Sequence, residues 1–175
     1  MIANVLQWLL DRIHALWPLR IVDADEQGVK FSGGSRVTLL LPGIHFFLPY
    51  YEVLEKVNVK YQEVDCLPQT LETADGVSVT LSVNVGYTIT DAVKWRTEVQ
   101  HFDGTVERRI RGLITPAVLG MSWSELRDAE TVTNLRKRLY RDLKRFGEKC
   151  GVRFHSVAVT DLTRAKSIRF FTSTN

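Results

Sequence analysis

The sequence has only two cysteines among its 175 residues, Cys66 and Cys150, and no Cys-x-x-Cys pair. Two thiols cannot form the dense disulfide framework of a small secreted domain, so we interpret both as reduced and expect a cytosolic or cytosol-facing protein. The four histidines are scattered, and none lies at metal-ligand spacing from another histidine or a cysteine. We therefore expect neither a metal nor a cofactor.

Familiar catalytic motifs are missing as well. The sequence contains no Gly-x-Ser-x-Gly, Walker loop, His-Glu-x-x-His or dinucleotide-binding fingerprint. The segment Ser32-Gly33-Gly34-Ser35 follows a predicted strand without opening a helix, which disfavours a phosphate-binding loop. His155 is close in sequence to Cys150, but ordinary packing explains it better than a base that activates a thiol. We therefore expect a protein that is not an enzyme.

A strong charge of one sign and a long hydrophobic run are also absent. The net charge is +3 and the pI is near 8.9, which permits contact with anionic lipid but lacks the sharp basic patch of a dedicated nucleic-acid binder. We expect no nucleic-acid partner. No segment offers the about 20 apolar residues of a membrane-spanning helix, and no basic region precedes the first apolar stretch as in a signal peptide. Apolar residues make up 45% of the chain and charged residues 25%, which is typical of a globular protein with a core.

Residues 1–17 predict an amphipathic helix that Pro18 closes. Its apolar face and the tryptophan at the margin of that face are candidate membrane contacts: Ile2, Val5, Leu6, Trp8, Leu9, Leu10, Ile13, Leu16 and Trp17. Such a helix can lie in the interface of a bilayer, where tryptophan is favoured. It can equally pack on the protein's own core or on a neighbouring subunit. The sequence leaves both interpretations open.

Short alternating runs between residues 20 and 90 predict β-strands. The runs cover 20–24, 28–31, 36–41 and 43–48, and glycine or proline between them predicts tight turns in hairpins or a meander. Val77–Ile89 alternates apolar and polar residues throughout, which predicts a strand with one buried face. Because Asp75-Gly76 is a turn signal, we expect this strand to pair with one inside 56–72.

The second half of the chain predicts helices and a final strand. The expected elements are helices over 91–99, 105–119 and 130–149 and a strand over 152–162. Asp91 is suited to cap the first helix, and Ser122-Trp123-Ser124-Glu125 fits a capping box before a further short helix. Pro116 is expected to end or kink the helix in which it lies.

The helix expected over 130–149 has a basic face, formed by Arg136, Lys137, Arg138, Arg141, Lys144, Arg145 and Lys149. One interpretation is a binding surface for anionic lipid or nucleic acid. The other is a solvated face that pairs with nearby acidic residues, namely Glu107, Glu125, Asp128, Glu130, Asp142 and Glu148. We take the following as candidate contacts between subunits: Arg136, Arg138, Arg141, Lys144 and Arg145.

Several segments, taken in order, resemble one protein family. The two most specific are Pro42-Gly43-Ile44-His45-Phe46-Phe47-Leu48-Pro49 and Thr73-Ala74-Asp75-Gly76-Val77-Ser78-Val79. Met121-Ser122-Trp123-Ser124-Glu125-Leu126-Arg127 follows, before the long helix and the last strand. Over residues 20–165 the chain resembles the SPFH superfamily (stomatin, prohibitin and flotillin), also called band 7.

The resemblance implies an α+β fold with a curved, mostly antiparallel sheet and helices on one side, preceded here by the N-terminal amphipathic helix. It divides the chain into that helix (1–18), an SPFH domain (19–165) and a short tail (166–175). It also implies association with a membrane and side-by-side assembly. Most family members have a membrane span or hydrophobic hairpin before the domain and a long coiled coil after it. This sequence shows neither, so we expect assembly through contacts of the domain itself.

The resulting hypothesis is a homo-oligomeric scaffold, in a ring or cage, that is peripheral or monotopic on a cytosol-facing membrane and organises membrane or partner proteins. Further candidate membrane contacts lie around the Pro49 turn, namely Phe46, Phe47, Tyr50 and Tyr51. We expect at least one of the two phenylalanines in a hairpin core, because adjacent strand residues point to opposite faces. Two alternatives stay open. The chain could be a structural subunit of a virion or of a soluble cytoplasmic assembly, its N-terminal helix packed on neighbours, or it could regulate a membrane-bound protease.

Overall fold

The computed structural model describes residue 7 and residues 18–164. The elements, in chain order, are β1 (Leu19–Val22), β2 (Glu26–Ser32), β3 (Arg36–Leu40), β4 (Gly43–Phe46), β5 (Glu52–Asn58), β6 (Gln62–Glu72), β7 (Ser78–Ile89), α2 (Ala92–Glu98), α3 (Phe102–Leu119), α4 (Trp123–Leu126), α5 (Ala129–Cys150) and β8 (Val152–Arg164). The amphipathic helix predicted for residues 1–17 and the tail over 166–175 lie outside the described residues, apart from Gln7.

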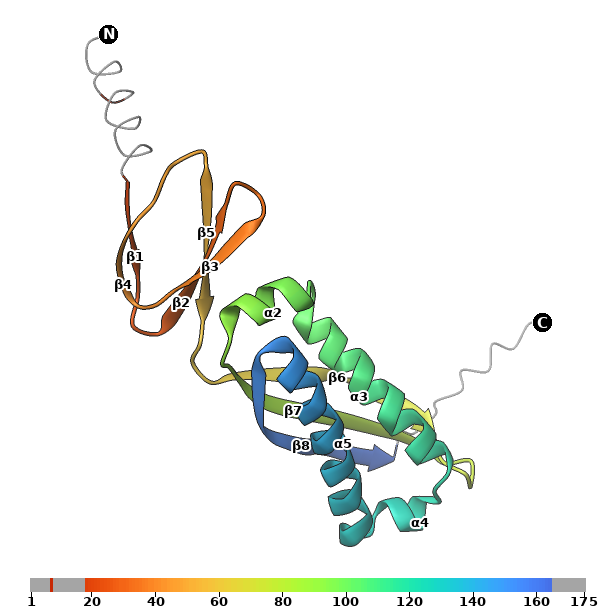
Figure 1. Cartoon of the computed structure of the whole chain (residues 1–175). Helices are drawn as coiled ribbons and strands as arrows, with labels where there is room; N and C mark the ends of the chain where they lie inside the picture. Colours follow the sequence, from red (N-terminus) through yellow and green to blue (C-terminus); the bar gives the residue numbers. More distant parts are fainter. Residues whose placement is uncertain (1–6, 8–17, 165–175) are drawn as a thin grey trace, which may run out of the picture.

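The described residues form two lobes (Figure 1). The N-terminal lobe contains a two-stranded sheet, β1-β4, and a three-stranded sheet, β3-β2-β5. The C-terminal lobe contains the three-stranded sheet β6-β7-β8, and α3 and α5 lie across one of its faces. All described strand pairs are antiparallel, in agreement with the predicted α+β class.

The N-terminal lobe is built from short strands, and two glycines form one of its turns. Gly33 and Gly34 have φ of 57° and 77°, a conformation that suits glycine, and they close the β2–β3 hairpin where a turn was predicted. The remaining pairs join strands that are not sequence neighbours, because β1 pairs with β4 and β2 pairs with β5. The lobe is therefore held together by pairings that no local sequence signal specifies.

Strand β7 is the centre of the C-terminal sheet. Its residues at odd positions, from Val79 to Ile89, are all buried, while most of the alternating polar residues are partly exposed. The register with β6 places Asp65 beside Asn84 and Leu71 beside Val79, so the two strands share the same faces. The predicted one-sided strand and its hairpin partner are thus present, with the partner confined to Gln62–Glu72.

The helices α3 and α5 bury one face each. In α3 the buried residues recur at every fourth position, namely Phe102, Val106, Ile110, Ile114 and Val118. Pro116 was predicted to end or kink the helix. It does not end it, since α3 continues to Leu119. Pro116 and Gly112 are both exposed, so the Gly112 carbonyl that loses its i+4 donor faces water, and the buried residues on either side hold the helix in place.

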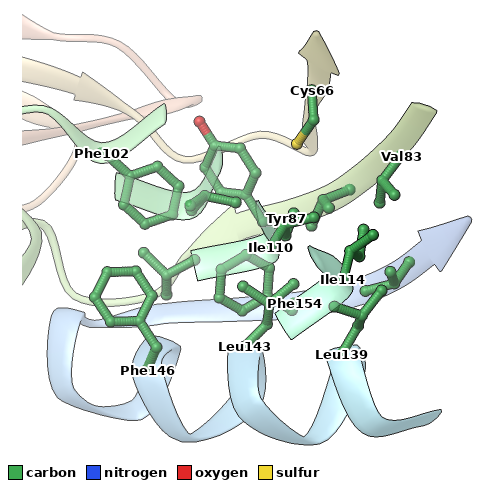
Figure 2. Packing of buried hydrophobic residues seen from close by; sticks show 14 of the residues in the cluster. Cys66, Val83, Tyr87, Phe102, Ile110, Ile114, Leu139, Leu143, Phe146 and Phe154 are labelled. Carbon is green, nitrogen blue, oxygen red and sulfur yellow. The ribbon is translucent and has the colours of Figure 1, made fainter. Parts of the chain in front are cut away.

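Aromatic rings fill one end of the core (Figure 2). The ring centroids of Tyr87 and Phe102 are 4.8 Å apart, and those of Phe102 and Phe146 are 6.1 Å apart in a stacked arrangement. Phe154 of β8 completes the group, also stacked on Phe102. Burial raises the pKa of the Tyr87 hydroxyl to about 12, so this side chain stays neutral in the core.

Helix α2 joins the two lobes. The Asp91 side chain caps it by accepting from the Lys94 amide, as predicted. The first amide of the helix, at Ala92, donates to the Gln27 side chain of β2 at 3.3 Å, and Arg96 forms a two-nitrogen ion pair with Glu55 of β5. Val29 and Val57 of the N-terminal lobe belong to the same buried cluster as the helices. The lobes therefore share a core and a polar contact at α2.

The Thr73–Gly76 turn is fastened to the start of α4. Both carboxylate oxygens of Asp75 accept from the Trp123 amide, at 3.1 and 3.2 Å, and the Thr73 hydroxyl donates to the same carboxylate. The Ala74 amide donates to the Met121 carbonyl at 2.9 Å. One of the two motifs that carry the family resemblance thus links the β6–β7 hairpin to the helical layer.

The Asp75→Asn substitution is expected to lower the Tm at neutral pH by several degrees, and more than Asp161→Asn, an exposed control on β8. The Thr73 hydroxyl and the Trp123 amide hold the pKa of Asp75 below its ordinary 3.8. A lowered pKa means that the contribution is present above pH 3.8 and is lost as pH falls through the lowered value. Thermal melts between neutral and acidic pH should therefore show a smaller acid-induced loss in the variant; equal losses in both proteins would contradict the role of Asp75.

Candidate functional site

An exposed apolar surface lies on the two-stranded sheet β1-β4. The register places Leu19 beside Phe46 and Ile21 beside Ile44, so these four side chains share one face. Their exposed fractions are 41% for Leu19, 59% for Ile21, 69% for Ile44 and 60% for Phe46. We call these four residues the β1–β4 face. Because neighbouring apolar side chains left in water are unfavourable, a contiguous group of this kind indicates a contact with a partner or a membrane.

The opposite side of this sheet is different in character. Val22 is buried, and the Arg20 guanidinium lies over the Phe47 ring at 5.3 Å from its centroid. Phe47 is half-buried and its amide donates to the Pro18 carbonyl at 2.6 Å. The expectation that Phe46 or Phe47 would enter a hairpin core was wrong, because Phe46 is exposed and Phe47 is covered only in part.

The turn after β4 extends the apolar surface. Leu48 and Tyr51 are exposed, and Tyr50, at 84%, is the most exposed large apolar side chain described. Tyr50 has a φ of 69°, which is rare for a residue with a side chain and persists only where the surroundings enforce it. The turn thus presents an aromatic ring to solvent next to the β1–β4 face.

Glu52 enforces that turn. Its carboxylate accepts from the Leu48 amide at 2.9 Å and from the Ser32 hydroxyl at 3.0 Å, and it pairs with Lys30 at 2.9 Å. The Glu52 side chain is only 8% exposed. Donation from Leu48 and then from Lys30 lowers its pKa from the ordinary 4.5, so it is charged at neutral pH. A charged anchor therefore fixes the position of the apolar residues around it.

A second surface lies on α5. The seven basic residues predicted for this helix are all exposed: Arg136, Lys137, Arg138, Arg141, Lys144, Arg145 and Lys149. In the part of the chain that the structure describes, none of them forms an ion pair with a carboxylate. Four of the six acidic residues named as their partners act elsewhere: Asp142 and Glu107 pair with arginines of α3, and Asp128 and Glu125 cap helices. The interpretation of a solvated face therefore agrees with the exposure of these residues, but the ion pairing that it included was wrong.

The two cysteines are free and buried, which suits packing more than chemistry. Burial raises the pKa of the Cys66 thiol to about 11, and burial also raises the pKa of Cys150, so neither forms a thiolate near neutral pH. His155 is exposed, and its ring lies 2.7 Å from the Thr88 hydroxyl. Within the described ranges, no group of three or more His, Cys, Asp or Glu side chains could hold a metal ion.

Sequence reasoning found part of the β1–β4 face. Phe46 was proposed as a membrane contact, but Leu19, Ile21 and Ile44 were interpreted only as strand residues. Their alternation with Arg20 and His45 was a usable signal for a face, and the missing information was that β1 pairs with β4. The candidate contacts Ile2, Val5, Leu6, Trp8, Leu9, Leu10, Ile13, Leu16 and Trp17 lie outside the described residues.

Comparison with known proteins adds relatives from two archaea. An uncharacterized protein of Methanocaldococcus jannaschii is 26% identical over 166 residues, which cover 93% of this chain and 82% of that protein. An uncharacterized protein of Archaeoglobus fulgidus is 33% identical over 87 residues, or 50% of this chain and 35% of that protein.

None of the helices in the described part of the chain is long and apolar enough to cross a membrane.

A family model supplies the remaining comparison. The model described as SPFH domain / Band 7 family matches residues 20–169, a span that includes every described strand but the first residue of β1, and every described helix. SPFH domains are found in membrane-associated scaffold proteins and generally are not enzymes. With most of its length covered by this match, the chain belongs to the SPFH, or band 7, family.

Proposed function

We propose that this protein is an oligomeric scaffold that contacts a membrane surface through the β1–β4 face and the segment 1–17, assembles laterally into a ring or cage, and organises membrane or partner proteins. The observation that supports the proposal best is the β1–β4 face itself, a cross-strand group of four exposed apolar side chains at the N-terminal end of the domain. Because membrane association is typical of the family, we take membrane lipid as the partner of this face.

The chemistry of the face suits the interface of a bilayer. Burying a large apolar side chain is worth about 1.5–3 kcal/mol, so several together can hold a protein on a lipid surface. Tyr50, exposed in the adjacent turn, is of the residue type favoured at the boundary between hydrocarbon and water. The Glu52 contacts hold this turn in place, so the protein presents a preformed contact surface.

We assign the lateral contacts between subunits to the basic face of α5. The exposed residues Arg136, Arg138, Arg141, Lys144 and Arg145 provide positive charge that no described carboxylate neutralises. Charged surfaces of this kind direct association and fix the relative orientation of partners.

The double substitution Ile44→Asp/Phe46→Asp in the full chain is expected to weaken binding to liposomes by about 100-fold, because two apolar contacts of roughly 1.5 kcal/mol each are lost and each 1.4 kcal/mol is tenfold. Liposome flotation with phosphatidylcholine vesicles measures this. The matched control is Leu67→Asp/Leu119→Asp, two exposed apolar residues of the other lobe, which should float as the unmodified protein does.

A second pair, Leu9→Asp/Ile13→Asp, tests the segment 1–17 in the same assay. If both pairs reduce flotation, the two contacts act together. If the unmodified protein assembles in buffer but does not float, the membrane proposal fails and the structural subunit of a soluble or virion-type assembly takes its place. If the control pair loses flotation equally, the β1–β4 face has no special role.

A further inference from the structure

The face of the β6-β7-β8 sheet that α3 and α5 leave uncovered is polar and acidic. The register places Glu63, Asp65 and Glu72 of β6 and Asp161 of β8 on the side of the even-numbered β7 residues, from Ser78 to Thr88. All four carboxylates are exposed. Among the lysines and arginines of these three strands, only Arg153 lies on this side, at the end of the sheet. We call these four acidic residues the acidic sheet face.

Part of the acidic sheet face is held in a fixed arrangement. The Asn84 amide nitrogen donates to Asp65 at 2.6 Å and to Glu63 at 3.2 Å, which draws two carboxylates together over the middle strand. The Tyr61 hydroxyl donates to the other oxygen of Glu63 at 2.9 Å. Like charges this close repel each other, and neutral donors reduce but do not cancel that repulsion. A cationic group of a partner would neutralise these carboxylates.

The opposite side of the same lobe carries the opposite charge. Helix α5 has seven basic and three acidic residues and buries its apolar stripe toward the sheet, so its basic face points away from it. Figure 1 shows the sheet on one side of this lobe and α5 on the other. Among the described residues, no lysine or arginine of α5 forms an ion pair with a carboxylate of the acidic sheet face.

We propose that the acidic sheet face of one copy binds the basic face of α5 in the next copy, head to tail. This inference rests on the proposed self-assembly and states which two surfaces are in contact in it. A two-fold contact through either surface would place like charges opposite each other, which is unfavourable. The head-to-tail contact pairs opposite charges at every junction, and a repeated contact of this type closes into a ring when its rotation allows.

The size of the contact predicts how strong it is. Three strands about 4.8 Å apart and about 11 residues long at roughly 3.3 Å each give a flat area of about 500 Å². This is less than the roughly 800 Å² per partner of a standard stable interface. Self-association in dilute solution should therefore be weak, should rise with concentration, and should fall as salt screens the charges.

A charge-exchange experiment on the full chain tests the proposal. The sheet variant carries Glu63→Lys, Asp65→Lys and Asp161→Lys, and the helix variant carries Arg141→Glu, Lys144→Glu and Arg145→Glu. Each variant alone has two surfaces of like sign, so its self-association at low salt should fall at least tenfold in sedimentation velocity. An equimolar mixture of the two should recover association, because each variant then meets its complement, and a chain with all six substitutions should recover it as well.

The controls separate folding and membrane effects from assembly. Arg36→Glu and Glu98→Lys reverse exposed charges of each sign outside the two surfaces and should leave association unchanged. Both triple variants should still float with uncharged phosphatidylcholine vesicles, since the β1–β4 face is intact. If single variants associate normally, or if neither the mixture nor the sixfold variant recovers association, the head-to-tail contact is wrong even where flotation upholds the membrane proposal. An unmodified chain that stays monomeric at high concentration and low salt overturns both the contact and lateral assembly.

Discussion

Replacing Leu139 by alanine is expected to destabilise the folded protein by about 2–5 kcal/mol, the range for removing a buried leucine. The Leu139 side chain is fully buried, at 0% exposure. Figure 2 shows it on α5, in the cluster that also holds Ile114 of α3 and Val83 of β7. Its loss would leave a cavity where the helical layer meets the sheet, and neighbours on rigid elements can close such a cavity only in part.

The effect is large because total stability is small. A domain of this size unfolds at a free-energy cost of about 5–15 kcal/mol, so one core leucine is a substantial share. Urea denaturation should show a lower midpoint with an unchanged slope. The same change at Leu67, which is 67% exposed in the irregular part of β6, should stay within about 0.5 kcal/mol of the unmodified protein. Equal effects at the two positions would contradict the described core.

The central strand and the helices could be predicted from the sequence because their signals are local. The alternation over Val77–Ile89 specifies which side of β7 is buried, and Asp75-Gly76 specifies the turn to its partner. The caps at Asp91 and Ser122 needed only neighbouring residues as well. Each of these predictions depends on residues a few positions apart, and the structure agrees with each of them.

The functional surfaces depend on contacts between distant segments. The β1–β4 face exists because Leu19–Val22 pairs with Gly43–Phe46, across the β2–β3 hairpin, and neither strand alone shows which partner it takes. The acidic sheet face has the same origin, since Asp161 joins Glu63 and Asp65 only through the pairing of β8 with β7. The position of Asp142 of α5 beside Arg109 of α3 likewise follows from tertiary packing.

Replacing Gly147 by alanine is expected to destabilise the protein by about 1–3 kcal/mol, although alanine normally stabilises a helix relative to glycine. An added Cβ at Gly147 would lie 2.3 Å from the Val152 carbonyl oxygen and 3.0 Å from the Phe154 ring. The carbonyl belongs to the backbone of β8, which turns back from α5 at Gly151 with a φ of 69°. Because backbone cannot rotate aside as a long side chain can, α5 and the start of β8 would have to separate.

Gly112 of α3 provides the matched control, because nothing lies within 4 Å of a Cβ built there. Gly112→Ala should stabilise the protein by about 0.5–1 kcal/mol, the ordinary gain for alanine inside a helix. The same substitution in two helices is therefore expected to change stability with opposite signs, which denaturant midpoints resolve directly. If Gly147→Ala also stabilises, α5 and β8 are not in close contact, and the position of the basic α5 surface relative to the acidic sheet face would have to be revised.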